Sequence, residues 1–557
     1  MYIRVNKPFV IINAFSMFRI NDLSVALISN LNTFGAILML HSTKMNVPRQ
    51  NVSKFFAEYT KVTGIHGLSY LAERRSKTEK IFWLLVIVSS LIGCLVMIAQ
   101  IIEKYHNNPV VVSFDTKDTA ISRIPFPAVT ICPESKCSEK KFNYSDAYMR
   151  AHNWNNLNKS ELLKFKYVSS LCNDFEQNIF LKNSGKTFGS DFFDVIDELQ
   201  PSEFSTCNYM GEAFDCAELF TPIFTDEGIC YSFNILDRKD MFQKDVVWYK
   251  KYQNVTSEPL SYENDLGYLT SDVITYPSRA LMSGADNSLQ IEFHHVQYNT
   301  DLLCNKYYQG FRVLLHNPTE IPRPSKFCFQ IPLDEIVTAS IEPQLIQTAN
   351  SVRKYKPEKR NCYMGNDRQL KYFKIYTQQN CQFECWTNFT LNHCGCVHYF
   401  MPRIGNTKIC GFDSLDCAKQ VDRELSIQEL QNEMSGITTK CECKPSCTSL
   451  SYNVETSNSR FYMKEYLDLR NTSNIFEEPH KHHFSMLVVY FKVDQFLAIQ
   501  RNELYGVSDF IANVGGLFGL FIGFSLISTI EIIYFLTLRI YYNFKLYGRW
   551  SGVPNSN

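Results

Sequence analysis

The residues with the most evident chemistry stand in an apolar stretch between positions 510 and 538. Small residues and one acid gather there: Ala512, Gly515, Gly516, Gly519, Gly523, Ser525 and Glu531. At about 3.6 residues per turn, positions 512, 516, 519 and 523 fall near one face of a helix. A break at Gly523-Phe524-Ser525 would present backbone carbonyls and a hydroxyl to a desolvated cation.

Two hypotheses account for this pattern. Gly515-x3-Gly519-x3-Gly523 fits close packing of small residues between membrane helices. The alternative is a pore, which several copies of such a narrow-faced helix could surround. Glu531 favours an aqueous or paired environment, because a carboxylate inside a membrane is costly. The stretch would measure about 43 Å as one helix, longer than a bilayer needs, so we expect a break or a strong tilt.

A second apolar segment supports a membrane protein. Ile81 to Ile102 contains 22 residues without a charge, enough to cross a hydrocarbon core of about 30 Å. Lysines and arginines are denser before this segment than after it, and three follow the 510–538 stretch. The positive-inside rule therefore predicts that both termini are cytoplasmic in a plasma-membrane protein.

This topology predicts five regions along the chain. They are a cytoplasmic region 1–80, a first transmembrane helix 81–103, an extracellular domain 104–506, a second transmembrane helix 507–540 and a cytoplasmic tail 541–557. Leu23 to Leu40 is also uncharged and could be a third span or a signal-like segment. Asn30 and Asn32 weaken insertion, so we favour a non-spanning extension; Met45 is an alternative start.

Composition excludes several classes of protein. The chain has 56 Lys+Arg and 56 Asp+Glu, so no cationic excess is available for nucleic acid. We find no nucleophile–base pair, phosphate-binding loop or dinucleotide motif, and expect neither an enzyme nor a cofactor. The bilayer is the expected partner, together with an extracellular ligand or matrix.

The 19 cysteines indicate an oxidising compartment. Cys94 lies in the first span, and the other eighteen lie between Cys132 and Cys447, where nine disulfides could use all of them. A zinc site is the alternative, but C-x-C spacing is unlike a zinc knuckle. Five sequons in the same region predict glycosylation: Asn143, Asn158, Asn254, Asn388 and Asn471.

The extracellular region is expected to be mixed α+β. Strand-like runs occur at 128–132, 230–235 and 310–316, and Met486 to Val493 has the continuous apolar character of a buried central strand. Charged helix-permissive stretches occupy 144–199 and 425–434.

Ordered motifs over residues 60–540 resemble the degenerin/epithelial sodium channel family, above all its insect pickpocket subfamily. The motifs are His66-Gly67, FPAVTIC at 126–132, GICYSFN at 228–234, GFRVLLHNPTEIP at 310–322, CECKPSC at 441–447 and GGLFGLFIGFSLISTIEIIYF at 515–535. The resemblance implies a trimer, homomeric or heteromeric, with two membrane helices and a hand-shaped ectodomain of palm, β-ball, knuckle, finger and thumb. It implies an amiloride-sensitive pore for sodium, opened by an extracellular mechanical or chemical stimulus.

The resemblance also assigns roles to residues. Gly523, Phe524 and Ser525 match the selectivity tract, and Ala512 matches the position where bulky side chains hold the channel open. Gly519 matches a pore glycine tied to amiloride block, and His66-Gly67 a cytoplasmic gating motif in a re-entrant segment. Phe524 is bulkier than usual, and Tyr534 replaces a second acid found in some members.

The family pairing implies seven disulfides: Cys132–Cys230, Cys207–Cys216, Cys362–Cys447, Cys381–Cys443, Cys385–Cys441, Cys394–Cys417 and Cys396–Cys410. For the remaining four cysteines we predict Cys137–Cys172 and Cys304–Cys328.

Some residues leave alternatives open. His480, His482 and His483 suggest a pH sensor or zinc site, but a solvated loop is the favoured interpretation. Glu503 and Asp509 could concentrate cations or be ordinary interfacial charges. The alternative function is a non-conducting or regulatory subunit, or a disulfide-rich receptor that needs a partner subunit.

Overall fold

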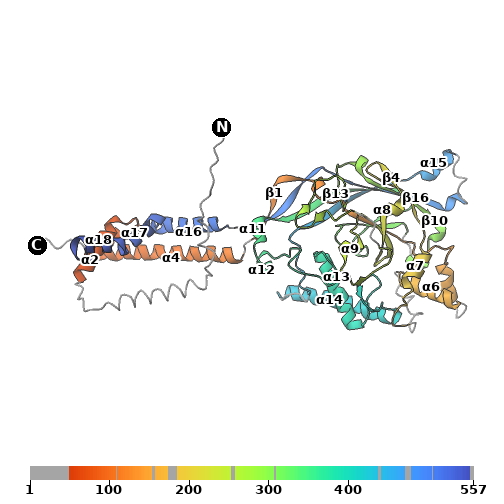
Figure 1. The fold of residues 1–557 in the computed structure, drawn as a ribbon, viewed down its shortest axis with the longest axis horizontal. Coiled ribbons are helices and arrows are strands. Elements are labelled where there is room, and N and C mark those ends of the chain that lie inside the picture. Colours follow the sequence, from red (N-terminus) through yellow and green to blue (C-terminus); the bar gives the residue numbers. More distant parts are fainter. Residues whose placement is uncertain are drawn as a thin grey trace. The chain divides into compact units, whose positions relative to one another are not determined.

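The computed structural model describes most of the chain. The described residues are 49–107, 110–152, 157–172, 185–252, 258–305, 309–436, 441–470, 478–504 and 506–551. The chain divides into two compact units. The helical unit comprises Met1–Asn107 and Tyr505–Asn557, and the disulfide-rich unit comprises Asn108–Leu504. The labels in Figure 1 mark the elements of each unit.

Helix α4 (Lys77–Asn107) contains the first apolar segment. Its stretch Lys77–His106 is long and apolar enough to cross a membrane, and only 6% of its most apolar window is buried. Among the described residues it is the one unbroken helix of this kind. A second is counted only if α16 (Val507–Ile522) and the helices after it are taken as one bent segment.

The predicted break in the second apolar segment is confirmed. Helix α17 (Leu526–Leu536) follows α16 after three residues, and α18 (Leu538–Tyr547) continues from it. The helical axis bends by 71° at this break. Helix α16 packs along α4, where Gly93 leaves room for the ring of Phe521. Helices α2 (Arg49–Val62) and α3 (Leu68–Ala72) precede α4.

An eight-stranded sheet organises the disulfide-rich unit. Its order is β1 (Val110–Ala120), β17 (Gln495–Glu503), β13 (Glu335–Thr348), β16 (His482–Phe491), β10 (Leu289–Val296), β3 (Phe204–Tyr209) and β4 (Glu212–Phe214), with β15 (Ser449–Arg460) also paired to β13. Strand β13 runs parallel to β16 and β17, and the other pairs are antiparallel. Strand β16 is therefore central, as its continuous apolar run predicted.

A five-stranded antiparallel sheet contains the other three predicted strands. Its order is β12 (Phe329–Ile331), β11 (Phe311–His316), β2 (Ala128–Pro133), β6 (Gly228–Phe233) and β5 (Phe220–Thr225). Val129, Ile131 and Phe311 pack with Leu289 and Leu487 of the larger sheet in one buried cluster. This shared core fixes the two sheets against each other, because burial of each apolar side chain contributes about 1.5–3 kcal/mol.

Helices flank the sheets; three lie in the charged stretch 144–199 and one covers 425–434, as the sequence predicted, while the helix over 378–394 was not predicted. They are α5 (Tyr144–His152), α6 (Lys159–Ser169), α7 (Phe192–Leu199), α13 (Gln378–Cys394) and α14 (Phe412–Met434). Helix α14 packs against α13 (Figure 1). Asn158 caps α6 by accepting a hydrogen bond from the Glu161 amide at 2.8 Å.

Eight disulfides staple this unit, and the seven family pairs are confirmed among them. All ten cysteines between Cys362 and Cys447 are paired, so none offers a thiolate to a metal. The eighth bridge corrects our prediction. It joins Cys172 at the end of α6 to Cys304 in α10 (Leu302–Asn305), with Cα atoms 4.7 Å apart.

The predicted pairs Cys137–Cys172 and Cys304–Cys328 are therefore wrong. Helix α10 packs against α5 beside α6, and this packing brings together two cysteines 132 residues apart. Cys137 and Cys328 are free thiols, the first buried and the second exposed.

Thiol labelling distinguishes the two arrangements. We expect a maleimide to modify Cys328 in the folded protein and Cys137 only after denaturation. Burial raises the pKa of Cys137 to about 12, and the thiolate is the nucleophile. Peptide mapping without reduction measures this, and labelling of neither cysteine after denaturation would support the earlier pairing.

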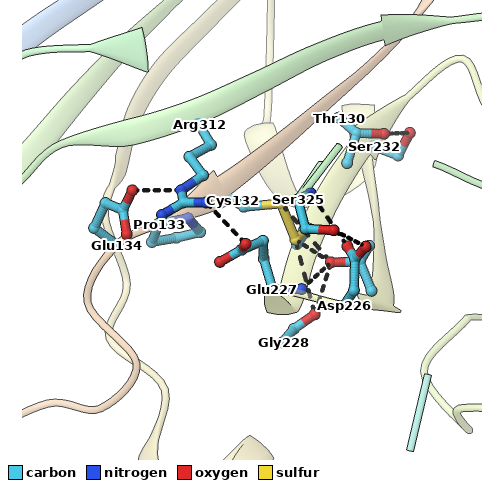
Figure 2. Close-up of a disulfide and its surroundings, with 12 residues drawn as sticks. Thr130, Cys132, Pro133, Glu134, Asp226, Glu227, Gly228, Ser232, Arg312 and Ser325 are labelled. Atoms are coloured by element: carbon cyan, nitrogen blue, oxygen red, sulfur yellow. Dashed lines mark hydrogen bonds and ion pairs between the residues drawn. A yellow bond between two sulfur atoms is a disulfide. The ribbon is translucent and has the colours of Figure 1, made fainter. Parts of the chain in front are cut away.

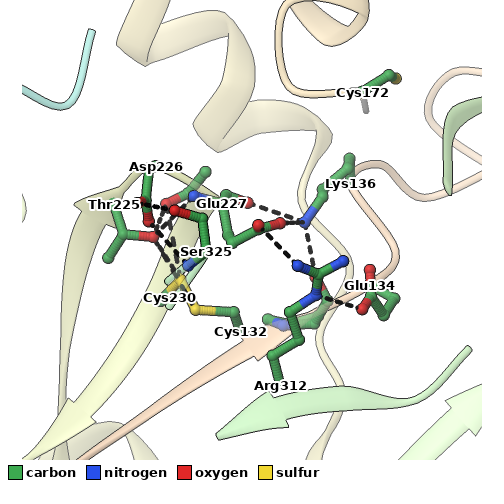
Figure 3. A network of polar contacts seen from close by, with 12 residues as sticks. Cys132, Glu134, Lys136, Cys172, Thr225, Asp226, Glu227, Cys230, Arg312 and Ser325 are labelled. Atoms are coloured by element: carbon green, nitrogen blue, oxygen red, sulfur yellow. Dashed lines mark hydrogen bonds and ion pairs between the residues drawn. A yellow bond between two sulfur atoms is a disulfide. The ribbon is translucent and has the colours of Figure 1, made fainter. Parts of the chain in front are cut away.

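A buried ionic network lies beside the Cys132–Cys230 disulfide. Arg312 bridges Glu134 at 2.6 Å and Glu227 at 2.8 Å (Figure 2). Lys136 reaches the Glu227 carboxylate at 3.6 Å and its backbone carbonyl at 2.8 Å (Figure 3). Burial raises the pKa of Glu227, and the charges of Lys136 and Arg312 oppose that rise.

Candidate functional site

The candidate site is the break between α16 and α17. Gly523 takes a left-handed conformation with φ of 72°, which ends α16 without the strain a side chain would add. Its N–H donates to Gly519 O at 3.0 Å, and Phe524 N–H donates to Phe518 O at 3.2 Å. The glycine therefore sets where the helix stops.

Ser525 starts the next helix. Its hydroxyl accepts a hydrogen bond from Ser528 N–H at 3.3 Å, an N-cap that satisfies one of the open amides of α17. Among the described residues, no backbone N–H bonds to the carbonyl oxygens of Gly523 or Phe524. The break thus combines two available carbonyls with a hydroxyl, the donor set expected of a cation-coordinating tract.

The segment between α2 and α3 contacts this break. His66 N–H donates to Ile522 O at 2.8 Å. The His66 ring lies against Gly523, where a Cβ atom would approach the ring to 2.8 Å. Gly67 has φ of 85° and packs against Ile87. The structure therefore brings His66-Gly67 and Gly523, predicted from distant motifs, into one site.

The glycine face of α16 has no neighbour within the described chain. Added Cβ atoms at Gly515, Gly516 and Gly519 would meet no atom within 4 Å, and Ala512 is exposed. The helix packing that these glycines permit is not used against α4. An uncovered face of small residues is available to other copies or to a lumen.

Glu531 lies on α17, about two turns past the break. Its side chain is half-buried, and Oε2 is enclosed without a hydrogen-bond partner among the described residues. Nearby, Phe55 and Tyr59 of α2 pack edge-on against Phe535. An acceptor held without a donor marks a position that water or an ion could satisfy.

Comparison with known proteins decides the family. The model of the family described as "Amiloride-sensitive sodium channel" matches residues 59–535. The chain belongs to this family. The resemblance drawn from its motifs is confirmed, and the relatives of the chain are ion channels rather than enzymes.

Three relatives illustrate the range of proteins that the chain resembles. Pickpocket protein 28 of Drosophila melanogaster is 28% identical over 519 residues, covering 88% of this chain and 80% of that protein. Sodium channel protein Nach of the same fly is 24% identical and covers 88% of both chains. Acid-sensing ion channel 1C of Danio rerio is 24% identical, covering 85% of this chain and 81% of its own.

The two acidic residues predicted either to concentrate cations or to be interfacial charges have structural partners. Asp509 accepts a hydrogen bond from Gly506 N–H at 3.1 Å and so caps α16. Glu503 accepts one from the Tyr355 hydroxyl. Both contacts support the interpretation as interfacial charges with local roles.

The histidines of the disulfide-rich unit are arranged differently from our expectation. His482 and His483 begin strand β16 rather than lie in a solvated loop, while His480 is exposed in the preceding turn. Strand pairing places them beside His294 and His295 of β10. His294 Nε2 and His482 Nδ1 are 2.6 Å apart, and His483 Nδ1 lies 2.6 Å from Asp334 Oδ2.

Sequence analysis missed His294 and His295 altogether. The available signal was the adjacent pair within the alternating run LQIEFHHV, in which every other residue, beginning with Leu289, is buried in β10. Their facing partners could not be known without the strand register.

Three histidines, of which His316 and His398 are buried and His294 is half-buried, predict acid sensitivity of the disulfide-rich unit. Burial lowers the pKa of His294, His316 and His398 from 6.5 to about 4. His316 Nδ1–H donates to Asn317 O at 2.9 Å, and Nε2 accepts from the Thr130 hydroxyl at 2.8 Å, so the ring is neutral. Between pH 6.5 and 4 the unfolded chain binds more protons, so stability falls as pH falls.

We expect each fully buried histidine to lower the free energy of unfolding by about 2 kcal/mol between pH 7 and 5. Thermal midpoints of the wild type and of His316→Gln measure this, and the variant should lose less on acidification. His480→Gln, at an exposed site, is the control. Parallel pH curves for the wild type and His316→Gln would contradict the assignment.

Proposed function

We propose that the chain is a subunit of a trimeric, amiloride-sensitive, sodium-permeable cation channel, homomeric or heteromeric, gated by an extracellular mechanical or chemical stimulus. The observation that carries the proposal is the break at Gly523-Phe524-Ser525, with two available carbonyls beside a hydroxyl. A passive membrane anchor needs no such break, because an unbroken helix satisfies its own backbone.

In this proposal α16 and α17 form the second membrane span. Gly523, Phe524 and Ser525 select sodium by replacing water with carbonyl and hydroxyl oxygens. Ala512, Gly515, Gly516 and Gly519 line the outer pore. The uncovered glycine face of α16 supports this placement, since three copies around an axis would enclose it.

The gating role of His66 and Gly67 rests on their contact with the break. A movement of the α2–α3 segment would shift the Ile522 carbonyl and the space beside Gly523 together. Glu531 would face the inner pore, where its enclosed oxygen could meet water or an ion.

The proposed topology keeps both termini cytoplasmic in the plasma membrane, with residues 104–506 outside. Disulfides in that region support exposure to an oxidising compartment. Glycans are proposed on the five sequons. Asn143 and Asn158 cap helices, and half-buried Asn388 accepts a hydrogen bond from the Tyr372 hydroxyl at 3.2 Å. Asn254 and Asn471 lie outside the described residues.

Whole-cell current from cells expressing Ala512→Val tests the function. A bulkier side chain on the pore-lining face should hold the channel open, giving a constitutive inward current that vanishes without external sodium and falls with amiloride. Val514→Ile adds bulk on roughly the opposite side of α16 and should leave the channel closed at rest.

Surface biotinylation accompanies this measurement. A protein present at the surface but silent as Ala512→Val would reject a self-sufficient channel. It would favour the regulatory subunit or receptor that needs a partner.

A further inference from the structure

A cavity of about 490 Å³ lies within the disulfide-rich unit and is lined by three arginines, Arg123, Arg279 and Arg353. We call it the arginine pocket. Arg123 ends the short helix η1 (Ile121–Arg123), and Arg353 ends α11 (Asn350–Arg353). The hairpin of β8 (Tyr262–Glu263) and β9 (Gly267–Tyr268) forms another wall. Its volume lies in the range of small-molecule sites.

The pocket is cationic. Its lining residues include three arginines and one acidic residue, Asp265. Asp265 Oδ2 already accepts a hydrogen bond from Gly365 N–H at 2.9 Å. The Arg353 guanidinium is held by the carbonyls of Thr348 and Asp265, so its charge is positioned without being neutralised there.

The guanidinium group of Arg279 is held in a fixed position at the pocket. Its guanidinium carbon stacks 4.0 Å from the centroid of the Tyr268 ring, and Nη2 donates to Thr270 O at 2.9 Å. Its Nε is buried and has no hydrogen-bond partner among the described residues. A fixed guanidinium with an unused N–H is suited to a planar acceptor such as a carboxylate.

Thr448 supplies an independent observation. Its side chain lines the same pocket, the residue is only 8% exposed, and its hydroxyl is enclosed without a partner among the described residues. Buried polar atoms are rarely left unpaired. Thr448 Oγ1 and Arg279 Nε can both donate, so the missing partner is an acceptor.

The remaining walls are apolar or aromatic. Ile124, Leu266 and Leu345 line the pocket together with the tyrosine rings of the hairpin. We propose that the arginine pocket binds an organic anion, a carboxylate carried on an apolar or aromatic body. The arginines and Thr448 bind the carboxylate, and the apolar walls bind the body.

The pocket also contacts strands that lead to the membrane helices. Leu345 and Gln347 belong to β13, whose residues Ile346–Thr348 pair with Ile499–Arg501 of β17. Strand β17 ends at Glu503, shortly before α16 begins. Arg123 follows β1, which begins shortly after α4. Resting on the proposed channel function, we infer that an anion bound here changes opening.

Direct binding tests the site without needing conduction. The full chain in detergent micelles is titrated with 2-naphthoate, and binding is followed by saturation-transfer NMR. We expect saturable binding that weakens about 10- to 100-fold for the neutral 2-naphthamide and for Arg279→Met, because each removes a charge-assisted contact. Equal affinity for naphthoate and naphthamide would overturn the proposal.

Two further variants test the site in case Arg279→Met fails to fold. Arg123→Gln alters an exposed side chain, and Thr448→Val keeps the side-chain shape while removing the hydroxyl. Both should weaken naphthoate binding. Arg470→Met is the matched control, since Arg470 also stacks on a tyrosine, Tyr466 at 4.9 Å, but lies outside the pocket. Loss of binding in Arg470→Met, or none in Arg123→Gln and Thr448→Val, rejects the site.

Current measurements test whether an anion bound in the arginine pocket changes channel opening. Naphthoate should change sodium current in the wild type and not in Arg123→Gln. Intact binding with an unchanged current rejects regulation by this pocket. An Ala512→Val protein that is silent at the cell surface but still binds naphthoate rejects a self-sufficient channel and leaves the anion site standing, so the two failures are distinguishable.

Discussion

We expect Gly523→Ala to remove the proposed sodium-selective current while the protein still reaches the cell surface. An alanine at this position must adopt φ of 72°, and its Cβ would stand 2.8 Å from the His66 ring. The strain of a non-glycine residue in a left-handed conformation costs of order 1–3 kcal/mol, before the steric contact is counted. Either the break or the His66 segment must move, and the carbonyls of the proposed selectivity tract should move with it.

Whole-cell recording with ion substitution checks this result in an Ala512→Val background, where current is expected without a stimulus. Gly395→Ala separates backbone strain from the local contact. Gly395 has a similar φ of 69° at the end of α13, and nothing lies within 4 Å of its added Cβ. Its alanine variant should keep its sodium selectivity.

A double-mutant cycle isolates the ring contact. If His66 causes the effect, His66→Ala and Gly523→Ala should be non-additive, because removing the ring opens space for the new methyl group. Strict additivity would show that the two residues act separately. Unchanged selectivity and current in Gly523→Ala would reject the break as the selectivity tract.

The second large effect concerns the stability of the disulfide-rich unit. Arg312→Gln should lower its free energy of unfolding by about 3–5 kcal/mol, because it leaves two buried carboxylates with one fewer cation. The Glu134 and Glu227 side chains are only 5% and 4% exposed, and Lys136 remains beside Glu227 alone. Protonation of a carboxylate relieves this repulsion, so the loss should be smaller at pH 5 than at pH 8.

Arg150→Gln is the matched control for this prediction. Arg150 also bridges two carboxylates, Asp146 at 2.8 Å and Glu161 at 3.3 Å, but in a partly exposed position between α5 and α6. Exposed ion pairs contribute little to stability, because water screens them, so Arg150→Gln should lose much less than Arg312→Gln. Thermal unfolding of the detergent-solubilised proteins compares the two variants, and equal losses would contradict a special role for burial.

Local sequence patterns predicted many of the helices and strands. The uncharged run of 81–102 forms one helix, α4, because its side chains favour a single apolar environment and its backbone needs no outside partner. Gly523 ends α16 because only glycine enters a left-handed conformation without strain, so the position of the break was readable from one residue type. Apolar runs likewise located β2, β6, β11 and β16.

Contacts between residues far apart in the chain could not be predicted by the same reasoning. Cys172 bonds Cys304 across 132 residues, and His294 meets His482 across 188. Local patterns of apolar and polar residues determine the conformation of a segment and the face it buries. They do not determine which other segment lies against that face, since this depends on the register of strands and the packing of helices.

The sequence by itself therefore determined the family, the two apolar segments and the position of the helix break, and it predicted the residues of the candidate pore. Only the tertiary structure decided the last disulfide, the pairing of histidines across β10 and β16, the buried network around Arg312 and the arginine pocket. The physical reason is common to all four. Each joins side chains from distant segments, and their burial and partners exist only once the chain has closed around them.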